Sequence, residues 1–99
     1  MVAMASAASG RAIARAAVAA NAKMAAAMQH TPTNDPDHDF AMMMVPHHQG
    51  AIDMAQIELQ FGKDPELRAM ANAIIAAQET EIAQLRRWMV APGMMGMAH

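Results

Sequence analysis

Apolar residues recur every three or four positions along most of the chain, which is the spacing of one face of an α-helix. In residues 6–29 this pattern is carried mainly by alanine, the residue with the highest intrinsic helix propensity. The pattern stops at Thr31-Pro32, because the residue before a proline disfavours helical backbone. A first helix is therefore predicted over residues 6–29.

Two further helices begin at the same kind of start signal, an aspartate cap followed by proline and an acidic residue. The two signals are Asp35-Pro36-Asp37 and Asp64-Pro65-Glu66. The second helix is predicted over residues 36–61, ending at Gly62, and the third over 65–90. Residues 91–99 are then expected to form a flexible, methionine-rich tail.

No segment alternates with the period of a strand, so residues 1–99 are predicted to form one all-α domain, an up-down bundle of three helices. Pro46 lies inside the second helix, where it removes one backbone hydrogen bond and is expected to bend the helix. The alternative is that this region forms two shorter helices.

The second helix carries a stripe that is predicted to face the bundle, because its members are spaced alternately by four and three positions. This stripe contains Phe40, Met44, His47, Ala51, Met54 and Glu58. A neighbouring apolar strip contains Ala41, His48, Ile52, Ala55 and Leu59. The face predicted to be solvated contains His38, Met42, Gln49, Asp53, Gln56 and Gln60. Both adjacent histidines are thus expected to point into apolar surface.

A buried imidazole needs a hydrogen-bond partner, and the third helix offers two polar residues on its inward stripe. That stripe is Leu67, Met70, Ile74, Gln78, Glu81, Leu85 and Trp88. A carboxylate that accepts one imidazole N–H leaves the other nitrogen free to bind a metal, so Gln78 and Glu81 are expected to support the ligands. The alternative is a metal-free polar pair between one inward histidine and Glu81 in the core.

Methionines surround the histidine pair, and their thioethers suit copper(I) and silver(I), which imidazole also binds. Zinc would need thiolates, or three histidines or carboxylates, and no such set is evident. We predict a copper(I) site, open also to silver(I) or copper(II). Its candidate ligands are Met24, Met28, Met43, Met44, His47, His48 and Met54. The alternative is that the methionines only fill the core.

Two weaker metal sites are also considered. His38 and Met42 lie one turn apart on the face predicted to be exposed. The tail places four donors within six residues: Met94, Met95, Met97 and His99. The alternative is that these are exposed helix residues and an oxidisable tail without a metal.

The composition excludes several classes of protein. The 99 residues contain 13 methionines and no cysteine, so there is no disulfide scaffold and no thiolate metal site. A net charge of −2 argues against a nucleic-acid binder, and no apolar run is long enough to span a membrane. Only 3% of the residues are aromatic, so the core is short of large side chains and should gain stability from an ion or from self-association.

Residues 37–55, which include Met42-Met43-Met44-Val45-Pro46-His47-His48-Gln49-Gly50-Ala51, closely resemble the signature of the bacterial family called domain of unknown function 305. Residues 62–68, 77–82 and Trp88 resemble the second half of that family's pattern. The resemblance covers about residues 35–89, with Met24 and Met28 matching more loosely. One departure is Leu85, where many relatives carry methionine.

The resemblance implies a ferritin-like helical bundle that binds copper and silver through methionine and histidine, in the periplasm or outside the cell. The matching ligand positions are Met44, His47, His48 and Met54. We expect a non-enzymatic protein for copper sequestration, resistance or delivery, whose export signal has been removed. Its expected partners are a second copy of the chain and a copper donor or acceptor protein. The alternative is a structural helical oligomer whose core histidines bind no metal.

Overall fold

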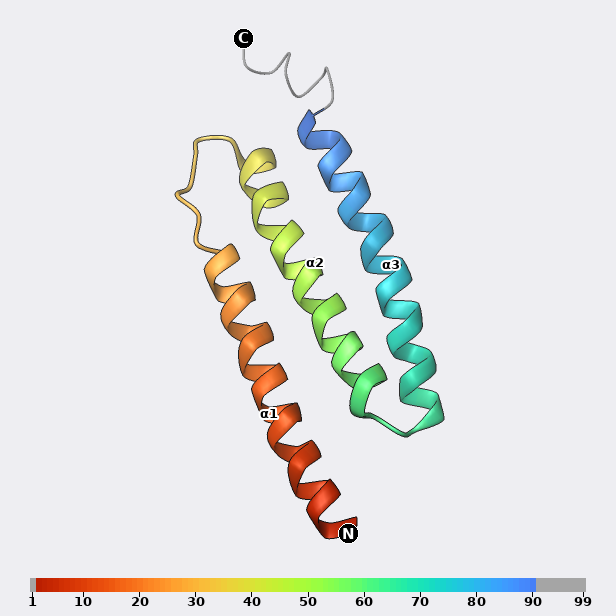
Figure 1. Cartoon of the computed structure of the whole chain (residues 1–99). Coiled ribbons are helices and arrows are strands. Elements are labelled where there is room, and N and C mark those ends of the chain that lie inside the picture. The colour runs from red at the N-terminus through yellow and green to blue at the C-terminus, as the bar shows by residue number, and fades with distance from the viewer. Residues whose placement is uncertain (1, 91–99) are drawn as a thin grey trace.

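The computed structural model describes the backbone of residues 2–90, and the side chains from residue 10 onward. It contains three helices, α1 (Val2–Ala27), α2 (Pro36–Phe61) and α3 (Pro65–Val90), and no strand in this part of the chain (Figure 1). The prediction of an all-helical fold is confirmed. The first helix begins and ends earlier than the predicted range of 6–29, whereas the other two occupy the ranges expected for them.

The three helices run alternately up and down, with α2 between α1 and α3 (Figure 1). Within the described residues, the backbone of α1 approaches that of α2 but nowhere that of α3. The molecule measures 65 × 26 × 15 Å, so the bundle is a flat layer. One side of α2 therefore faces α1 and the opposite side faces α3, so each side can form a separate site with its neighbour.

The start of α2 is fixed by the residues that the sequence singled out. The carboxylate of Asp35 accepts hydrogen bonds from the backbone N–H groups of Asp37, at 3.0 Å, and His38, at 3.4 Å. These bonds satisfy donors that have no partner within the helix, and Pro36 has no N–H to satisfy. The carboxylate of Asp64 caps α3 in the same way, at 2.9 Å from the backbone nitrogen of Leu67.

The end of α2 lies at Gly62, whose backbone is extended, with φ −75° and ψ 155°, rather than left-handed. A Cβ atom at this position would lie 2.6 Å from the backbone carbonyl oxygen of Glu58, so glycine is required by space and not by its φ angle. The terminal carbonyls are satisfied by Arg68 of α3, whose Nη1 donates to the carbonyl oxygens of Leu59, at 2.7 Å, and Gly62, at 3.1 Å. This long side chain therefore fixes the tight turn between α2 and α3.

The core lies between α2 and α3 and is built largely from small residues. The buried residues of this core are Ala41, His48, Ile52 and Ala55 on α2, with Ala71 and Ile82 on α3, whereas Gly50 of α2 is buried against α1. Alanine at the contact lets two helices approach closely, because the distance between helix axes depends on the side chains between them. The strip that includes His48 thus faces α3.

The stripe predicted to face the bundle is, in large part, exposed. Phe40 is 59% exposed, Met54 is 47% exposed and His47 is also exposed. On α3, Leu67 and Met70 are exposed as well, which corrects the predicted inward stripe. The alanine strip forms the closer contact between α2 and α3, and the larger apolar residues are left at its margin.

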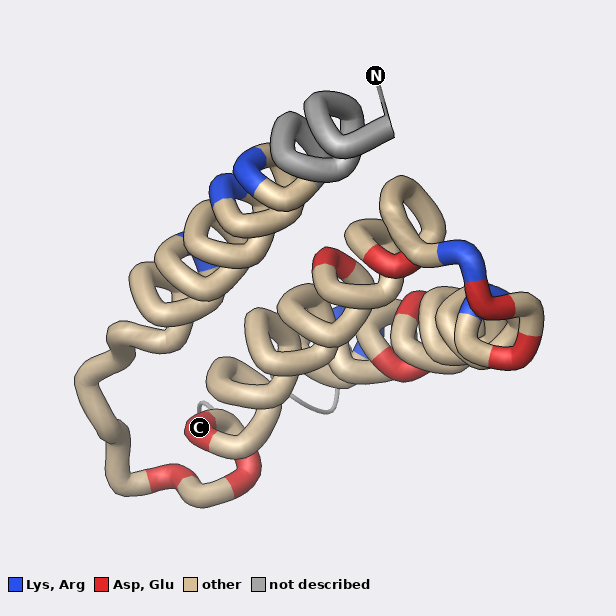
Figure 2. The backbone as a smooth tube through the Cα atoms, turned by 90° about the horizontal axis from the view of Figure 1, so that it is seen from below, with Lys and Arg blue, Asp and Glu red and all other residues tan. Residues whose placement is uncertain are grey.

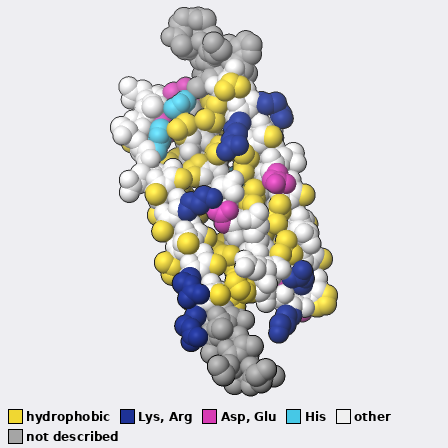
Figure 3. Space-filling model, in the orientation of Figure 1, with side chains coloured by type: hydrophobic (Ala, Val, Ile, Leu, Met, Phe, Trp, Pro, Cys, Tyr) yellow, Lys and Arg dark blue, Asp and Glu magenta, His cyan; other side chains and the backbone are white. Residues whose placement is uncertain are grey.

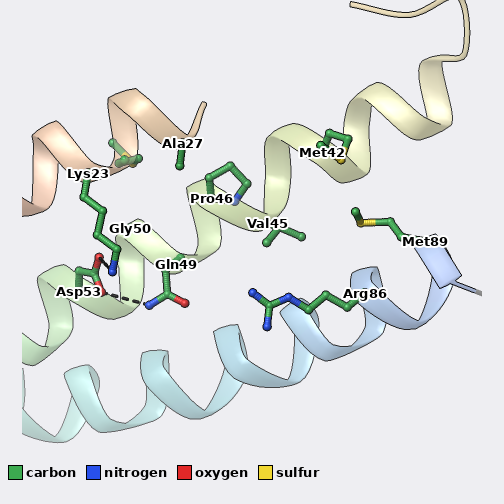
Figure 4. Close-up of a pocket in the computed structure, with 11 residues that line it drawn as sticks. Lys23, Ala27, Met42, Val45, Pro46, Gln49, Gly50, Asp53, Arg86 and Met89 are labelled. Carbon is green, nitrogen blue, oxygen red and sulfur yellow. Dashed lines mark hydrogen bonds and ion pairs between the residues drawn. The ribbon is translucent and has the colours of Figure 1, made fainter. Parts of the chain in front are cut away.

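The face of α2 predicted to be solvated is in part covered by α1. The side chain of Asp53 is only 15% exposed and lies 3.4 Å from the ammonium group of Lys23. The amide of Gln49 donates to the same carboxylate at 3.1 Å, as Figure 4 shows. The charged positions coloured on α1 are all basic, whereas acidic positions lie along α2 and beside its ends (Figure 2). Charge therefore helps to select this face of α2 for α1.

Helix α2 continues without interruption through Pro46, so the alternative of two shorter helices is wrong. No helix in residues 2–90 is both long enough and apolar enough to cross a membrane.

Candidate metal centre

A cavity of about 170 Å³ between α1 and α2 brings together three of the predicted copper ligands. These are Met24 of α1 with His47 and Met54 of α2. The remaining lining residues are Ala20, Asn21, Gly50 and Ala51, so no charged side chain is among those described around the cavity. Two thioethers and one imidazole therefore meet in a neutral, accessible site.

Gly50 allows Met24 to approach α2. A Cβ atom built at position 50 would lie 2.5 Å from Sδ and 3.2 Å from Cγ of Met24, which is closer than unbonded atoms approach each other. His47 and Met54 are two helical turns apart on α2, so their side chains lie on one face. The local sequence thus positions one thioether from each helix and one imidazole around the cavity.

A second cavity, of about 720 Å³, lies between α2 and α3 and contains Met44 and His48. His48 is 8% exposed, and its Nε2–H donates to the carboxylate of Glu81 at 2.6 Å. The other ring nitrogen, Nδ1, is buried and has no hydrogen-bond partner among the residues described. A carboxylate that fixes the tautomer in this way leaves Nδ1 with a free lone pair.

The hydrogen bond to Glu81, which was expected for one of the two histidines, is formed by His48. The cause is the packing described above, in which the strip containing His48 faces α3 and His47 faces α1 and solvent. Gln78, the other expected partner, reaches neither histidine, and its buried Oε1 accepts no hydrogen bond from the described residues.

The structure therefore divides the predicted ligands between two sites on opposite sides of α2. The ring centroids of His47 and His48 are 6.4 Å apart, and the rings are inclined by 63°. Met28 and Met43 are half-buried and line neither cavity. Leu85 lines the α2–α3 cavity, so the departure at this position leaves that cavity with Met44 as its thioether.

Met42 and its predicted partner His38 are half-buried rather than exposed. Met42 lines a third cavity, of about 290 Å³, together with Met24 and Met89 (Figure 4). Lys23, which pairs with Asp53, and Arg86 also line this cavity, so the net charge of its lining is positive and opposes the binding of a metal cation. The predicted site in the tail, Met94, Met95, Met97 and His99, falls outside the described residues.

His38 instead belongs to a group that the sequence analysis did not find. His30, His38 and Asp39 each offer one ligand atom, and these atoms all lie within 4.8 Å of one another. The hydrogen bond from His30 to Asp39, at 3.0 Å, and the bond from the backbone N–H of Thr33 lower the pKa of the Asp39 carboxyl below its ordinary value of 3.8. The sequence signal was weak, because His30 and Asp39 are separated by an irregular connection to which helical periodicity does not apply.

The model of the family described as Domain of unknown function (DUF305) matches residues 2–89. The chain belongs to this family. The match includes both cavities that contain predicted ligands, and the resemblance of residues 35–89 to this family is confirmed. A search of curated proteins finds no match to the sequence.

Proposed function

We propose that the protein binds copper(I) between α1 and α2, and that it sequesters or delivers the ion without catalysing a reaction. The observation that carries this proposal is the cavity shared by Met24, His47 and Met54. Thioether sulfur is a soft ligand that selects copper(I), and imidazole suits the same ion. Silver(I) has the same preference and is the expected surrogate, and copper(II) is a weaker candidate.

The charge and exposure of the site support a role in transfer. A neutral set of ligands carries no anionic group to compensate a divalent ion, which favours a monovalent one. His47 is exposed, so a donor or acceptor protein can reach the site without unfolding the bundle. The absence of cysteine from the sequence fits an oxidising compartment, and we propose the periplasm or the exterior of the cell.

The α2–α3 cavity is proposed as a weaker second copper site. His48 Nδ1 and the sulfur of Met44 are its candidate ligands, and Glu81 orients the imidazole ring. The ring is buried and the cavity is lined by fewer soft donors than the α1–α2 cavity, so an ion should bind here less tightly.

We also propose that the flat bundle is completed by a second copy, giving a ferritin-like arrangement of helices. A groove of about 330 Å³ on α2 and α3 is lined by Met54, Leu67 and Met70, each about half exposed. Apolar side chains gathered in this way are typical of an interface. Sedimentation of the metal-free protein over a range of concentrations tests the dimer, which a monomer at all concentrations would exclude.

Titration with copper(I) against a competing chelator tests the principal proposal. Met24→Leu and His47→Gln should each weaken binding by about tenfold or more, since even partners that only orient metal ligands contribute 10–100-fold. Met70→Leu is the matched control, because this methionine lies outside the α1–α2 cavity. Equal affinity in the wild-type protein, Met24→Leu and His47→Gln would reject the site.

The hydrogen bond between His48 and Glu81 favours a second candidate, a structural helical oligomer whose histidines bind no metal. A buried imidazole with a carboxylate partner is sufficiently explained by packing. This candidate predicts a melting temperature that rises with protein concentration but not with copper(I), because only a ligand that binds the native state stabilises it.

A further inference from the structure

The connection between α1 and α2 brings two imidazoles and a carboxylate together at one end of the molecule. His30 Nε2 lies 3.0 Å from Asp39 Oδ1, and His38 Nδ1 lies 3.9 Å from the same oxygen. The two imidazole rings are tilted by 42°, with their centroids 6.1 Å apart. Figure 3 shows histidine side chains gathered beside acidic ones in this region, at the upper left.

These three residues are partly withdrawn from solvent. The side chain of His30 is 13% exposed, that of Asp39 is 25% exposed and that of His38 is 29% exposed. The Nδ1 atom of His38 is buried, and it has no hydrogen-bond partner in the part of the chain that the structure describes. A buried polar atom without a hydrogen-bond partner costs free energy. Because His38 Nδ1 lies beside two other groups that can bind a metal, we expect its partner to be a bound ion.

The carboxylate of Asp39 is held in place by the connection itself. Oδ1 accepts hydrogen bonds from the backbone N–H and the hydroxyl of Thr33, at 3.0 and 2.9 Å, and Oδ2 lies 3.1 Å from the same N–H. Oδ1 is also the oxygen that His30 contacts, so Thr33 fixes the orientation of the whole carboxylate, as hydrogen bonds to ligating carboxylates do in general. The anionic ligand is therefore positioned before any ion arrives.

The distances agree with those between ligands around a small divalent ion. Zn²⁺ binds imidazole nitrogen and carboxylate oxygen at about 2.0–2.2 Å, which in a tetrahedron places neighbouring ligands about 3.3 Å apart. The observed separations of 3.0 and 3.9 Å lie on either side of this value. An ion would replace the hydrogen bond between His30 and Asp39, and all three ligand atoms already lie within 4.8 Å of one another.

We propose that His30, His38 and Asp39 bind a divalent transition-metal ion, with Zn²⁺ as the reference case. Two imidazoles and one carboxylate form a three-ligand set that leaves a fourth position for water. The set contains no thioether and carries one negative charge, so it prefers a divalent ion of intermediate softness to copper(I). The site is separate from both methionine cavities and does not depend on the proposed copper(I) function.

The bound ion would join the end of α1 to the start of α2. His30 lies three residues beyond the end of α1, and His38 and Asp39 are in the first turn of α2. Zn²⁺ should therefore raise the melting temperature of the protein, because it binds the folded connection only.

The test is a Zn²⁺ titration of the full chain against a chromophoric chelator, with melting temperatures measured alongside. Wild-type protein should bind one Zn²⁺ in this site, and His30→Gln and His38→Gln should each weaken binding by about tenfold or more. Both variants should also lose the rise in melting temperature. His47→Gln is the matched control, since it removes a histidine of α2 that lies outside this group.

Equal Zn²⁺ affinity in wild-type protein and in both loop variants would overturn the proposal, as would an equal loss in His47→Gln. A copper(I) titration of the same proteins separates the two sites. His47→Gln should lose copper(I) affinity and keep Zn²⁺ affinity, whereas His30→Gln should do the reverse. If the titrations reject one of the two proposed sites, they still test the other.

Discussion

The two sides of α2 differ in how closely they are packed, although they carry adjacent histidines. On the α3 side, alanines bring the helices together, and His48 is buried with a carboxylate at 2.6 Å. On the α1 side the contact is looser, and His47 is exposed beside a cavity lined by two thioethers. A one-residue step along α2 therefore separates a buried histidine that pairs with a carboxylate from an exposed one that lines a cavity with two thioethers.

The largest expected effect comes from removing both thioethers of the α1–α2 cavity. Met24→Leu combined with Met54→Leu should weaken copper(I) binding by about a hundredfold or more, if each ligand contributes at least tenfold. The stability of the metal-free protein should fall by less than about 1.5 kcal/mol, because leucine and methionine have similar volumes. Competition titrations and urea denaturation measure the two quantities.

Met44→Leu is the control for the double variant, since it removes a thioether from the other side of α2. It should leave the tighter copper(I) site intact. If Met44→Leu has the larger effect, the principal site lies between α2 and α3 and the comparison is reversed.

The next effect concerns stability on the α3 side. Glu81→Ala should destabilise the metal-free protein by about 1 kcal/mol, the ordinary net value of a hydrogen bond, because it removes the acceptor of the His48 Nε2–H and the Glu81 side chain is 52% exposed. Copper(I) binding between α1 and α2 should not change. Thermal and urea unfolding provide the measurement, with Glu79→Ala as a control at an exposed position on the same helix. An equal loss of stability in both variants would mean that the hydrogen bond between His48 and Glu81 does not stabilise the fold.

A smaller effect is expected from Gly50→Ala, which alters the cavity without removing a ligand. The added methyl group would displace the Met24 sulfur from its present position, so copper(I) affinity should fall by about tenfold, the lower end of the range for mispositioned ligands. Helix propensity alone would favour the alanine by about 1 kcal/mol. Gly10→Ala provides the control, since nothing lies within 4 Å of its Cβ and only propensity changes. An undiminished affinity in Gly50→Ala would show that Met24 is not a ligand.

The smallest effect should come from Leu85→Met, which adds a thioether to the α2–α3 cavity. We expect the second copper(I) ion to bind a few-fold more tightly, and the stability to change by less than about 1.5 kcal/mol. Leu67→Met is the control, because Leu67 lies outside that cavity. A copper(I) titration that resolves two ions per chain measures the affinity of the second ion. An unchanged affinity of that ion in Leu85→Met would argue against a site at His48.

The helices were predictable because their signals are local. Asp35 and Asp64 cap the helices that they were expected to begin, and Pro46 is accommodated within α2. The face that each helix buries was harder to predict, because large apolar residues such as Phe40 and Met54 dominate any hydrophobic pattern. Close contact between α2 and α3 depends instead on alanines, whose small contribution to hydrophobicity hides their effect on distance.

The candidate sites were predictable in composition and less so in geometry. The methionines and histidines of the α1–α2 cavity were all identified, but their grouping depends on which side of α2 faces α1. That choice involves the contact of Met24 with Gly50 and the ion pair between Lys23 and Asp53, which join distant parts of the sequence. His30 was missed for a related reason, since its partners lie across an irregular connection.

Helix α1 packs against the rest of the molecule along one side only. Its backbone approaches α2 and not α3 within the described residues, so it can separate without disturbing the alanine-rich core. Regions with few buried contacts open locally at lower free energy than the rest of a fold. Backbone amides of α1 should therefore exchange with solvent deuterium sooner than those of α3. An ion bound by Met24 and His47 would slow that exchange along α1. Metal binding would therefore be visible in hydrogen exchange as protection of the backbone amides of the whole helix.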